Sequence, residues 1–438
     1  MDTNDKEFDP VYGYVTKEAE GESSSSPNTL PPTDTGDTEL KKAKGKSFRG
    51  GFLVGSLSTL AIVVILVLVL VVHALFNGIG WVFTDDVESK ANFIEALIHE
   101  LYYKDVDDET MKEGIYAGIV DSIGDPYSRY YSAKEYDEAV IDTTGIYGGI
   151  GASLQKDQEP GEVVVVNIYD GVPADKAGLK EGDILVSADG QRGVDMDLEE
   201  YVRLIRGEAG TTVEIVYRRD DKENTVTITR DRISIPTVDH RMLDGNVGYI
   251  RISEFNSPTA DEFREALYDL QAQGMTSVIF DLRSNPGGLV DVVSDVLDEI
   301  LPEGTVVYME SKNGDRSTYR SDAKKHLDIP IAVLVDGYSA SASEIFAGAI
   351  RDFKYGTLIG TQTYGKGVVQ STLPLSDGSA VKITIAQYFT PSGECIEGVG
   401  IKPDIELEYE YTGDEEADEY DYSADNQVQK AIEILTKE

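Results

Sequence analysis

The sequence has very little cysteine and histidine. Cys395 is the single cysteine, so the chain can form no internal disulfide and no thiolate metal cluster. The four histidines are scattered, without the HExxH spacing or a similar spacing of metal ligands; they are His73, His99, His240 and His326. The sequence therefore predicts no metal and no cofactor, which argues against a metalloenzyme.

Positive charge is also scarce. Lysine and arginine number 39 against 80 aspartates and glutamates, which gives a formal net charge of −41. Nucleic-acid binding draws much of its affinity from cations that neutralise phosphates, so the charge excludes nucleic acid as the main partner. The length of 438 residues suggests roughly three domains and is enough for a sizeable core.

Residues 50–84 contain no Asp, Glu, Lys or Arg and hold a nearly unbroken apolar run. About 20 apolar residues cross the ~30 Å hydrocarbon layer, so we expect a transmembrane helix over 51–76. A cleaved signal peptide would lie nearer the start of the chain. Basic residues precede the run and acidic residues follow it, which predicts a cytoplasmic N-terminus and an extracytoplasmic remainder. The basic residues are Lys41, Lys42, Lys44, Lys46 and Arg49.

Both ends of the chain have the composition of tails. Residues 1–50 are rich in serine, proline and acids, and we expect a disordered cytoplasmic tail there. Residues 406–438 are expected to form a mobile, solvated acidic tail with a short helix over 426–435.

The part between the apolar run and the acidic tail changes pattern twice. Residues 85–142 carry apolar residues at helical spacing. Residues 143–233 consist of short β-rich runs separated by Gly, Asp and Pro turns, which indicate a compact β domain. Strands and helices alternate over 234–405, which predicts an α/β core with a largely parallel sheet. Sites in such sheets gather at the carboxyl ends of strands.

Two strand ends in the α/β region could carry chemistry. Consecutive glycines, Gly287 and Gly288, follow the strand predicted over 277–282, and they can turn backbone N–H groups toward a substrate as an oxyanion hole requires. Three serines, Ser339, Ser341 and Ser343, follow the strand predicted over 331–335 at the start of a helix, where a hydroxyl is exposed beside free backbone N–H groups. Each has a plainer alternative, namely a tight glycine turn and a capping box with S-x-x-E spacing.

A serine nucleophile needs a base, and the histidine nearest in sequence lies in a polar loop. Lys366 is flanked by glycines and followed by apolar residues, so burial could lower the pKa of its amine. The ordinary alternative is a surface lysine. Residues 360–366 also match G-x-x-x-x-G-K, the phosphate loop of nucleotide hydrolases, but Gly367 stands where Ser or Thr should hold magnesium. A β-like stretch follows in place of a helix, which argues against a nucleotide site.

Together these motifs resemble the carboxy-terminal processing (tail-specific) proteases, which are serine peptidases with a PDZ domain and a Ser-Lys dyad. The resemblance covers nearly all of the chain beyond the apolar run, and its departures are minor, with Asp336 in place of a frequent asparagine and Ile123 in place of a frequent leucine. The motifs that carry it are Ile123-Gly124-Asp125-Pro126-Tyr127, Tyr147-Gly148-Gly149-Ile150-Gly151, Pro173-Ala174-Asp175-Lys176-Ala177-Gly178-Leu179 with Gly182-Asp183-Ile184, Asn285-Pro286-Gly287-Gly288, Ser339-Ala340-Ser341-Ala342-Ser343-Glu344, Gly365-Lys366-Gly367 with Gln370, Pro391-Ser392-Gly393, and Gly400-Ile401-Lys402-Pro403-Asp404.

The resemblance implies an α/β fold with a crotonase/ClpP-like protease core, an inserted PDZ-like β domain, N-terminal helices and, with the apolar run, one transmembrane helix. It implies Ser341 as the nucleophile and Lys366 as the base, because the family lysine follows its serine by twenty-five residues. Gln370 resembles the glutamine that orients the lysine. The remaining implied site residues are Ala342 with Gly287 or Gly288 in the oxyanion hole, and Tyr147, Gly148, Gly149, Ile150 and Gly151 in the carboxylate-binding loop of the PDZ domain.

The implied function is a membrane-anchored serine endopeptidase that captures the free C-terminal tails of extracytoplasmic polypeptides and cleaves them through an acyl-enzyme. The expected partners are polypeptide substrates and a membrane reached by one helix. Self-association through the N-terminal helices and the C-terminal region is a further expectation. The absence of disulfides suggests a bacterial cell membrane. The alternatives are a membrane-anchored PDZ scaffold that binds C-termini without cutting them and, third, a nucleotide hydrolase.

Overall fold

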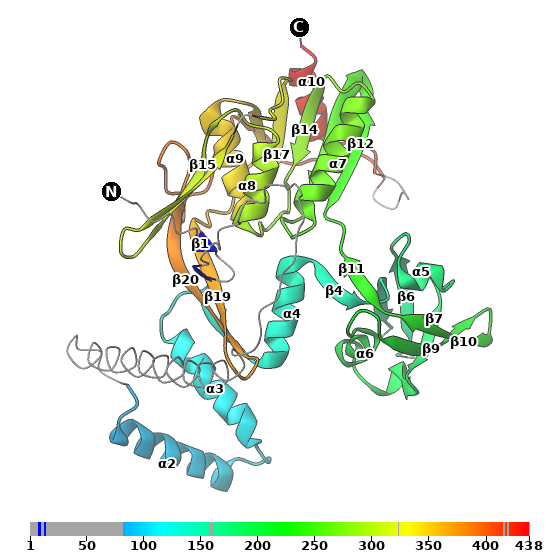
Figure 1. The fold of residues 1–438 in the computed structure, drawn as a ribbon, viewed down its shortest axis with the longest axis vertical. Coiled ribbons are helices and arrows are strands. Elements are labelled where there is room, and N and C mark those ends of the chain that lie inside the picture. Colours follow the sequence, from blue (N-terminus) through cyan, green and yellow to red (C-terminus); the bar gives the residue numbers. More distant parts are fainter. Residues whose placement is uncertain are drawn as a thin grey trace, which may run out of the picture. The chain divides into compact units, whose positions relative to one another are not determined.

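The computed structural model describes residues 8–9, 13–14, 82–157, 161–322, 324–414, 417 and 420–437. The chain divides into two compact units, one of residues 17–115 and one of residues 1–16 with 116–438. Figure 1 shows the described helices and strands, coloured along the sequence. The tail expected over 1–50 lies outside the described residues except for β1 (Phe8–Asp9) and β2 (Gly13–Tyr14), which pair antiparallel.

The expected fold class needs one correction, which concerns the transmembrane helix. Within the described ranges, no helix combines the length and the apolar character that a membrane crossing requires. The longest described helix, α2 (Asp85–Leu101), has 17 residues and carries three acids in its first turn. Residues 51–76, on which the expectation rested, lie outside the described residues. The fold class is therefore a mixed α/β fold with an inserted β domain, without the transmembrane helix that was expected as part of it.

The chain after residue 101 begins with short elements whose ends are set by local sequence. Helix α3 (Asp108–Asp121) is followed by β3 (Arg129–Tyr131) and α4 (Ala133–Thr144). A capping box starts α4, in which the Ser132 N–H donates to Oε2 of Glu135 over 2.9 Å. Gly145, with a φ of 67°, ends the helix in the left-handed conformation.

The β domain enters and leaves through neighbouring strands. Its first strand, β4 (Ile146–Gly149), pairs antiparallel with its last, β11 (Asp231–Ser234). Between them lies a six-stranded antiparallel sheet in the order β10-β9-β7-β6-β5, with β8 on β7, closed over a core that includes Val163, Tyr201 and Ile215. Its elements are β5 (Ala152–Lys156), β6 (Val163–Ile168), α5 (Pro173–Lys176), β7 (Ile184–Ala188), β8 (Gln191–Arg192), the 3-10 helix η1 (Gly193–Asp195), α6 (Leu198–Ile205), β9 (Thr212–Arg219) and β10 (Lys222–Thr229).

The α/β region is built on a six-stranded sheet in the order β12-β13-β14-β17-β18-β21, parallel except for β12. Side chains alternate between its faces, because Val278 and Phe280 of β14 join the core beneath α7, α8 and α9, whereas Ile279 joins the core beneath α10. The elements, of which β12, α7, β14, α8, β17, α9 and α10 are labelled in Figure 1, are β12 (Val238–Leu243), η2 (Asp244–Asn246), β13 (Val247–Ile252), α7 (Thr259–Ala272), β14 (Ser277–Asp281), α8 (Val290–Asp298), β17 (Ile331–Val335), α9 (Ala342–Phe353), β18 (Thr357–Gly360), β21 (Ile405–Glu406) and α10 (Asn426–Leu435).

A second, antiparallel sheet runs in the order β16-β15-β20-β19, with β3 on β20. Its strands are β15 (Gly304–Ser311), β16 (Arg316–Ser321), β19 (Val368–Pro374) and β20 (Ala380–Phe389). It places the loop before β19, which carries Lys366, beside the strand ends of the first sheet.

The C-terminal segment is not the free tail that its composition predicts. Asp425 is fully buried, and its backbone forms an isolated bridge with Tyr411. The expectation of a solvated segment is therefore wrong for Asp425, because its carboxylate binds Arg283 of the protease core.

Candidate active site

Ser341 lies at the turn from β17 to α9, with φ at 53° and ψ at −112°. A positive φ strains a residue that has a Cβ, at about 1–3 kcal/mol, so the surroundings must hold it there. All five residues of β17 and the first nine of α9 are buried, which leaves the turn no room to relax. A strained serine between a strand and a helix start presents its hydroxyl at the edge of the sheet.

Glu344, in the first turn of α9, connects this serine to a distant loop. Its Oε2 accepts the backbone N–H of Ser341 over 2.9 Å and that of Lys366 over 2.8 Å. Its Oε1 accepts the Thr363 hydroxyl over 2.6 Å and the Gly365 N–H over 2.7 Å. The pKa of Glu344 is raised, because burial outweighs these bonds, each of which lowers it. Three of the four partners are backbone N–H groups, which can only donate, so both carboxylate oxygens act as acceptors.

Lys366 stands in the loop between β18 and β19 and is half-buried. Its Nζ lies 4.9 Å from the ring centroid of Tyr127. The hydroxyl of Tyr388 donates to the backbone carbonyl of Lys366 and, over 3.1 Å, to that of Ser341. Tyr388 and Glu344 thus each contact both backbones, one through the carbonyl groups and one through the N–H groups.

Burial lowers the pKa of Lys366, and the positive charge of Lys382 lowers it further. Three carboxylates raise the pKa of Lys366, those of Glu397, Glu344 and Asp125. A lysine amine with a lowered pKa can be neutral at ordinary pH, which is the condition for its use as a base.

A pocket of about 550 Å³ opens beside Lys366. Its lining is mostly aromatic and apolar, from Tyr127, Ser284, Pro286, Tyr338, Ala340, Tyr364 and Lys366. Ser341 itself is not among the lining residues, but its neighbour Ala340 is. The pocket suits an apolar side chain of an extended peptide laid across the serine turn.

The glycine loop after β14 lies against this turn. A Cβ on Gly287 would come within 2.7 Å of the Cβ of Ser341, and one on Gly288 would come within 2.2 Å of the Phe255 carbonyl oxygen. The φ values of 109° and 138° also favour glycine at both positions. The Gly287 N–H donates to Oδ1 of Asn285 over 2.8 Å. The loop therefore brings glycine backbone to Ser341, while the choice between the two glycines as the oxyanion donor stays open.

Gln370 lies in β19, next to an irregularity in its pairing with β20. Its amide nitrogen donates to Oγ1 of Thr384 over 3.2 Å. Thr384 in turn donates its backbone N–H to the Ser128 hydroxyl, close to the Asp125–Tyr127 segment. The expectation that Gln370 orients the amine of Lys366 stays a prediction.

The five residues expected to bind a carboxylate divide between a strand and a turn. Three of them, Tyr147, Gly148 and Gly149, lie in β4 and pair with β11. The other two follow the strand: the carbonyl of Ile150 accepts the Ala174 N–H, and that of Gly151 accepts the Tyr169 N–H.

Sequence reasoning missed three residues around Ser341 and Lys366. Glu344 carried a signal, the S-x-x-E spacing, but that spacing predicts only a helix cap. Tyr127 lies in the motif of residues 123–127, but no role was predicted for its side chain. Tyr388 had no signal, because its two carbonyl partners lie 22 and 47 residues away in the chain.

The nucleotide alternative finds no support in the geometry. The 360–366 stretch leads into β19 and not into a helix, so no helix N-terminus faces a phosphate there. Within the described part of the chain, no group of three or more His, Cys, Asp or Glu residues is placed to hold a metal ion.

Comparison with known proteins shows which families the chain is similar to. Family profiles match the chain as "Peptidase family S41" over residues 246–407, "PDZ domain" over 164–219 and "Activating protease CtpB N-terminal domain" over 84–135. The solved structure of a "Photosystem II D1 C-terminal processing protease" is 30% identical with a TM-score of 0.44, covering 72% of this chain and 86% of that one.

Two curated relatives are similar over most of the chain. "Carboxy-terminal processing protease CtpA" of Bacillus subtilis (strain 168) is 36% identical over 329 residues, which are 74% of this chain and 70% of that protein. A "Probable CtpA-like serine protease" of Staphylococcus aureus (strain N315) is 33% identical over 326 residues, 73% of this chain and 64% of that protein, so the match spans just under two thirds of the staphylococcal protein. The chain belongs to the carboxy-terminal processing proteases of peptidase family S41, which are serine-type peptidases with a PDZ domain.

Proposed function

We propose that this chain is an endopeptidase in which Ser341 is the nucleophile and Lys366 the base of an acyl-enzyme mechanism. The observation that carries the proposal is the carboxylate of Glu344, whose single oxygen Oε2 accepts the backbone N–H of both residues. One buried acceptor thereby holds the serine turn and the lysine loop in a fixed relation, as a nucleophile and its base require.

The mechanism begins when neutral Lys366 accepts the hydroxyl proton of Ser341, whose Oγ attacks the carbonyl carbon of the scissile peptide bond. The carbonyl oxygen becomes an oxyanion and accepts the N–H of Ala342 and of one glycine, Gly287 or Gly288. Loss of one such donor typically costs about 3 kcal/mol of transition-state stabilisation. The aromatic ring of Tyr127 faces the ammonium that forms on Lys366.

The ammonium then gives its proton to the leaving nitrogen, the C–N bond breaks, and the acyl group stays on Ser341. Lys366, neutral again, accepts a proton from a water molecule that attacks the ester carbonyl. Collapse of this second oxyanion, with return of the proton to Oγ, releases the carboxylic acid product and restores the serine.

The PDZ domain supports polypeptides with free C-termini as substrates. Such domains take an extended segment as an added strand and bind its carboxylate on backbone N–H groups. We propose that the stretch from Tyr147 to Gly151 captures the tail and that the cut is made beside the pocket at Lys366. The extracytoplasmic location and the self-association expected from the sequence stay predictions.

Cleavage of casein by the purified full-length chain tests the dyad. We expect Ser341→Ala and Lys366→Ala each to lower the rate by at least about 10³-fold, since members of such a unit fail together. Lys402→Ala is the matched control, because Lys402 is an exposed lysine with a side chain 73% accessible, and it should keep the wild-type rate. Wild-type cleavage by either dyad variant would remove the proposal.

A further inference from the structure

Arg283 stands at the end of β14, two residues before Asn285 in the glycine loop. Its guanidinium is bonded to Asp281, with Nε 2.9 Å from Oδ1 and 3.0 Å from Oδ2. The hydroxyl of Tyr249 donates to Oδ2 of Asp281 over 2.7 Å. Asp281 is buried, and the side chain of Arg283 is only 13% exposed.

The second carboxylate on Arg283 comes from the C-terminal segment. Oδ2 of Asp425 lies 2.9 Å from Nη2 of Arg283 and also accepts the Tyr420 hydroxyl over 2.8 Å. Oδ1 of Asp425 has a different task, since it accepts the N–H groups of Gln427 and Val428 and so caps α10. Oδ1 of Asp425 therefore caps α10, and Oδ2 binds Arg283.

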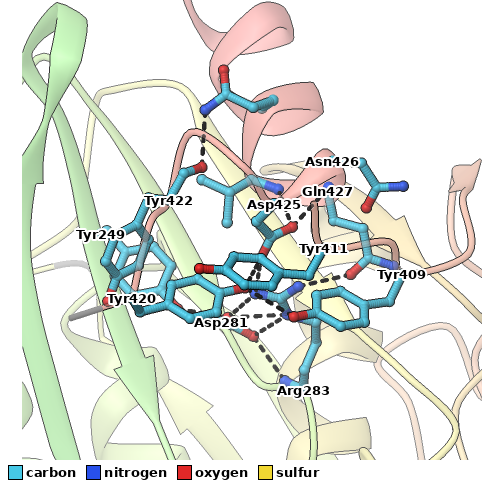
Figure 2. Close-up of polar contacts among 12 residues, drawn as sticks. Tyr249, Asp281, Arg283, Tyr409, Tyr411, Tyr420, Tyr422, Asp425, Asn426 and Gln427 are labelled. Carbon is cyan, nitrogen blue, oxygen red and sulfur yellow. Dashed lines mark hydrogen bonds and ion pairs between the residues drawn. The ribbon is translucent and has the colours of Figure 1, made fainter. Parts of the chain in front are cut away.

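Tyrosines surround this ion triad of Asp281, Arg283 and Asp425, as Figure 2 shows. The ring of Tyr409 lies 5.3 Å from the guanidinium carbon of Arg283. Tyr420 stacks on Tyr411 with the ring centroids 4.8 Å apart. The acid- and tyrosine-rich segment thus supplies both a charge and an aromatic cover to Arg283.

The loop that follows Arg283 is hydrogen-bonded to the backbone beside Ser341. Asn285, two residues after Arg283, accepts the Gly287 N–H on its side chain and the Ala340 N–H on its backbone carbonyl. The opposite side of the loop is held by Asp336, whose carboxylate accepts the Ser284 N–H over 3.0 Å. The loop is therefore fixed from two sides, one within the protease core and one from the C-terminal segment.

We propose that Asp425 is a positioning residue of the active site, which holds Arg283 and through it the 284–288 loop in the conformation that gives the oxyanion its glycine donor. The proposal rests on the proposed roles of Ser341 and Lys366. Loss of the Asp425 carboxylate leaves Arg283 paired with Asp281 but removes the charged acceptor that ties its guanidinium to the C-terminal segment, so the arginine and the loop after it are held less firmly. The C-terminal segment is then part of the catalytic apparatus and not an appendage.

Asp425→Asn separates the two tasks, because the amide oxygen can still cap α10 while the NH₂ group replaces the acceptor that faced Arg283 and Tyr420. In the full-length chain we expect kcat on casein-derived peptides to fall about tenfold or more, with KM changed less than about twofold. Asp421→Asn is the matched control, since Asp421 is an exposed acid of the same segment whose carboxylate accepts the N–H and the hydroxyl of Ser423. The control should keep the wild-type kcat.

Hydrogen–deuterium exchange of the peptide that covers residues 282–290 gives a second readout that does not depend on catalysis. Exchange there should be faster in Asp425→Asn and unchanged in Asp421→Asn. If the wild-type chain cleaves nothing, the dyad proposal fails, and the exchange result still decides whether Asp425 holds the loop. Wild-type exchange and wild-type kcat in a folded Asp425→Asn variant overturn the inference.

Tyr420→Phe covers the case in which Asp425→Asn fails to fold. It removes the hydroxyl that donates to Oδ2 of Asp425 and that lies 3.1 Å from the Tyr409 hydroxyl, and we expect the same changes at a smaller size, about twofold in kcat. Unchanged kcat and unchanged exchange in this variant would also count against the positioning role.

Discussion

In the proposed mechanism Lys366 must be neutral when it accepts the proton of Ser341, so its surroundings would set the pH range of activity. Burial lowers the pKa of this amine first, and Lys382 lowers it second. Below its pKa the amine is protonated and cannot act as a base. Activity should therefore fall as the pH falls through the pKa of Lys366, and the low-pH limb of kcat/KM reports that pKa.

Two substitutions should move this limb in opposite directions. Lys382→Gln removes a positive charge, so the pKa of Lys366 rises and the limb moves to higher pH. Glu397→Gln removes a carboxylate that favours the ammonium, so the limb moves to lower pH. The measurement is kcat/KM against pH for both variants, with Lys402→Gln as a lysine control whose limb should not move. If the low-pH limb of kcat/KM moves in the same direction in both variants, a group other than Lys366 is responsible for it.

At the scale of elements, Glu344 connects the start of α9 with the loop before β19. Each of its oxygens accepts two donors, so Glu344→Gln leaves two buried donors facing an NH₂ group in either orientation of the amide. An unsatisfied buried donor costs about 1–3 kcal/mol. We expect the free energy of unfolding to fall by about 2–4 kcal/mol and kcat by about a hundredfold.

Urea unfolding and single-turnover cleavage measure these two effects of Glu344→Gln. Glu310→Gln makes the same change on the exposed β15–β16 hairpin, and both values should stay near those of the wild type. A Glu344→Gln variant with normal stability and normal turnover would contradict the coupling of serine turn and lysine loop.

The elements differ in how well the sequence predicts them. The buried strand β17 (Ile331–Val335) has the expected bounds, because a continuous apolar run bounded by turns leaves few alternatives. The β15–β16 hairpin was not predicted, since the polar strand β16 (Arg316–Ser321) has no apolar run. The burial of Asp425 was not predicted, because the acidic composition of the C-terminal segment indicates a solvated tail. Asp425 is buried against Arg283, which lies 142 positions earlier in the sequence.

The candidate active site, too, could be predicted only in part. Ser341 and Lys366 could be named from local residue types and from a family resemblance. The contacts that relate them, through Glu344 and Tyr388, depend on how α9, β19 and β20 pack and could not be read from spacing. The role of Gln370 remains a prediction, because its amide contacts Thr384.

At the scale of the whole molecule, the PDZ domain and the protease core should act on the same polypeptide. If the PDZ loop binds a terminal carboxylate, a substrate that ends in a free carboxylate should bind more tightly than its amidated twin. Hydrogen bonds to a charged group contribute about 1.5–3 kcal/mol, so the Kd should differ by about tenfold or more. Binding is measured on Ser341→Ala, so that cleavage does not interfere.

A long unstructured peptide and its C-terminal amide make the matched pair for that experiment. A short peptide without the tail is the control, and amidation should leave its Kd unchanged. Equal Kd values for the two long peptides would mean that the carboxylate is not what the domain recognises.

Covalent labelling of the serine tests the central claim most directly. The full-length chain is treated with a fluorophosphonate, and the modified residue is identified by mass spectrometry of its peptides. The dyad predicts a single adduct on Ser341, formed faster as the pH rises, absent in Ser341→Ala and at least about 10³-fold slower in Lys366→Ala. An adduct on another serine, or a wild-type rate of labelling without Lys366, would contradict the account.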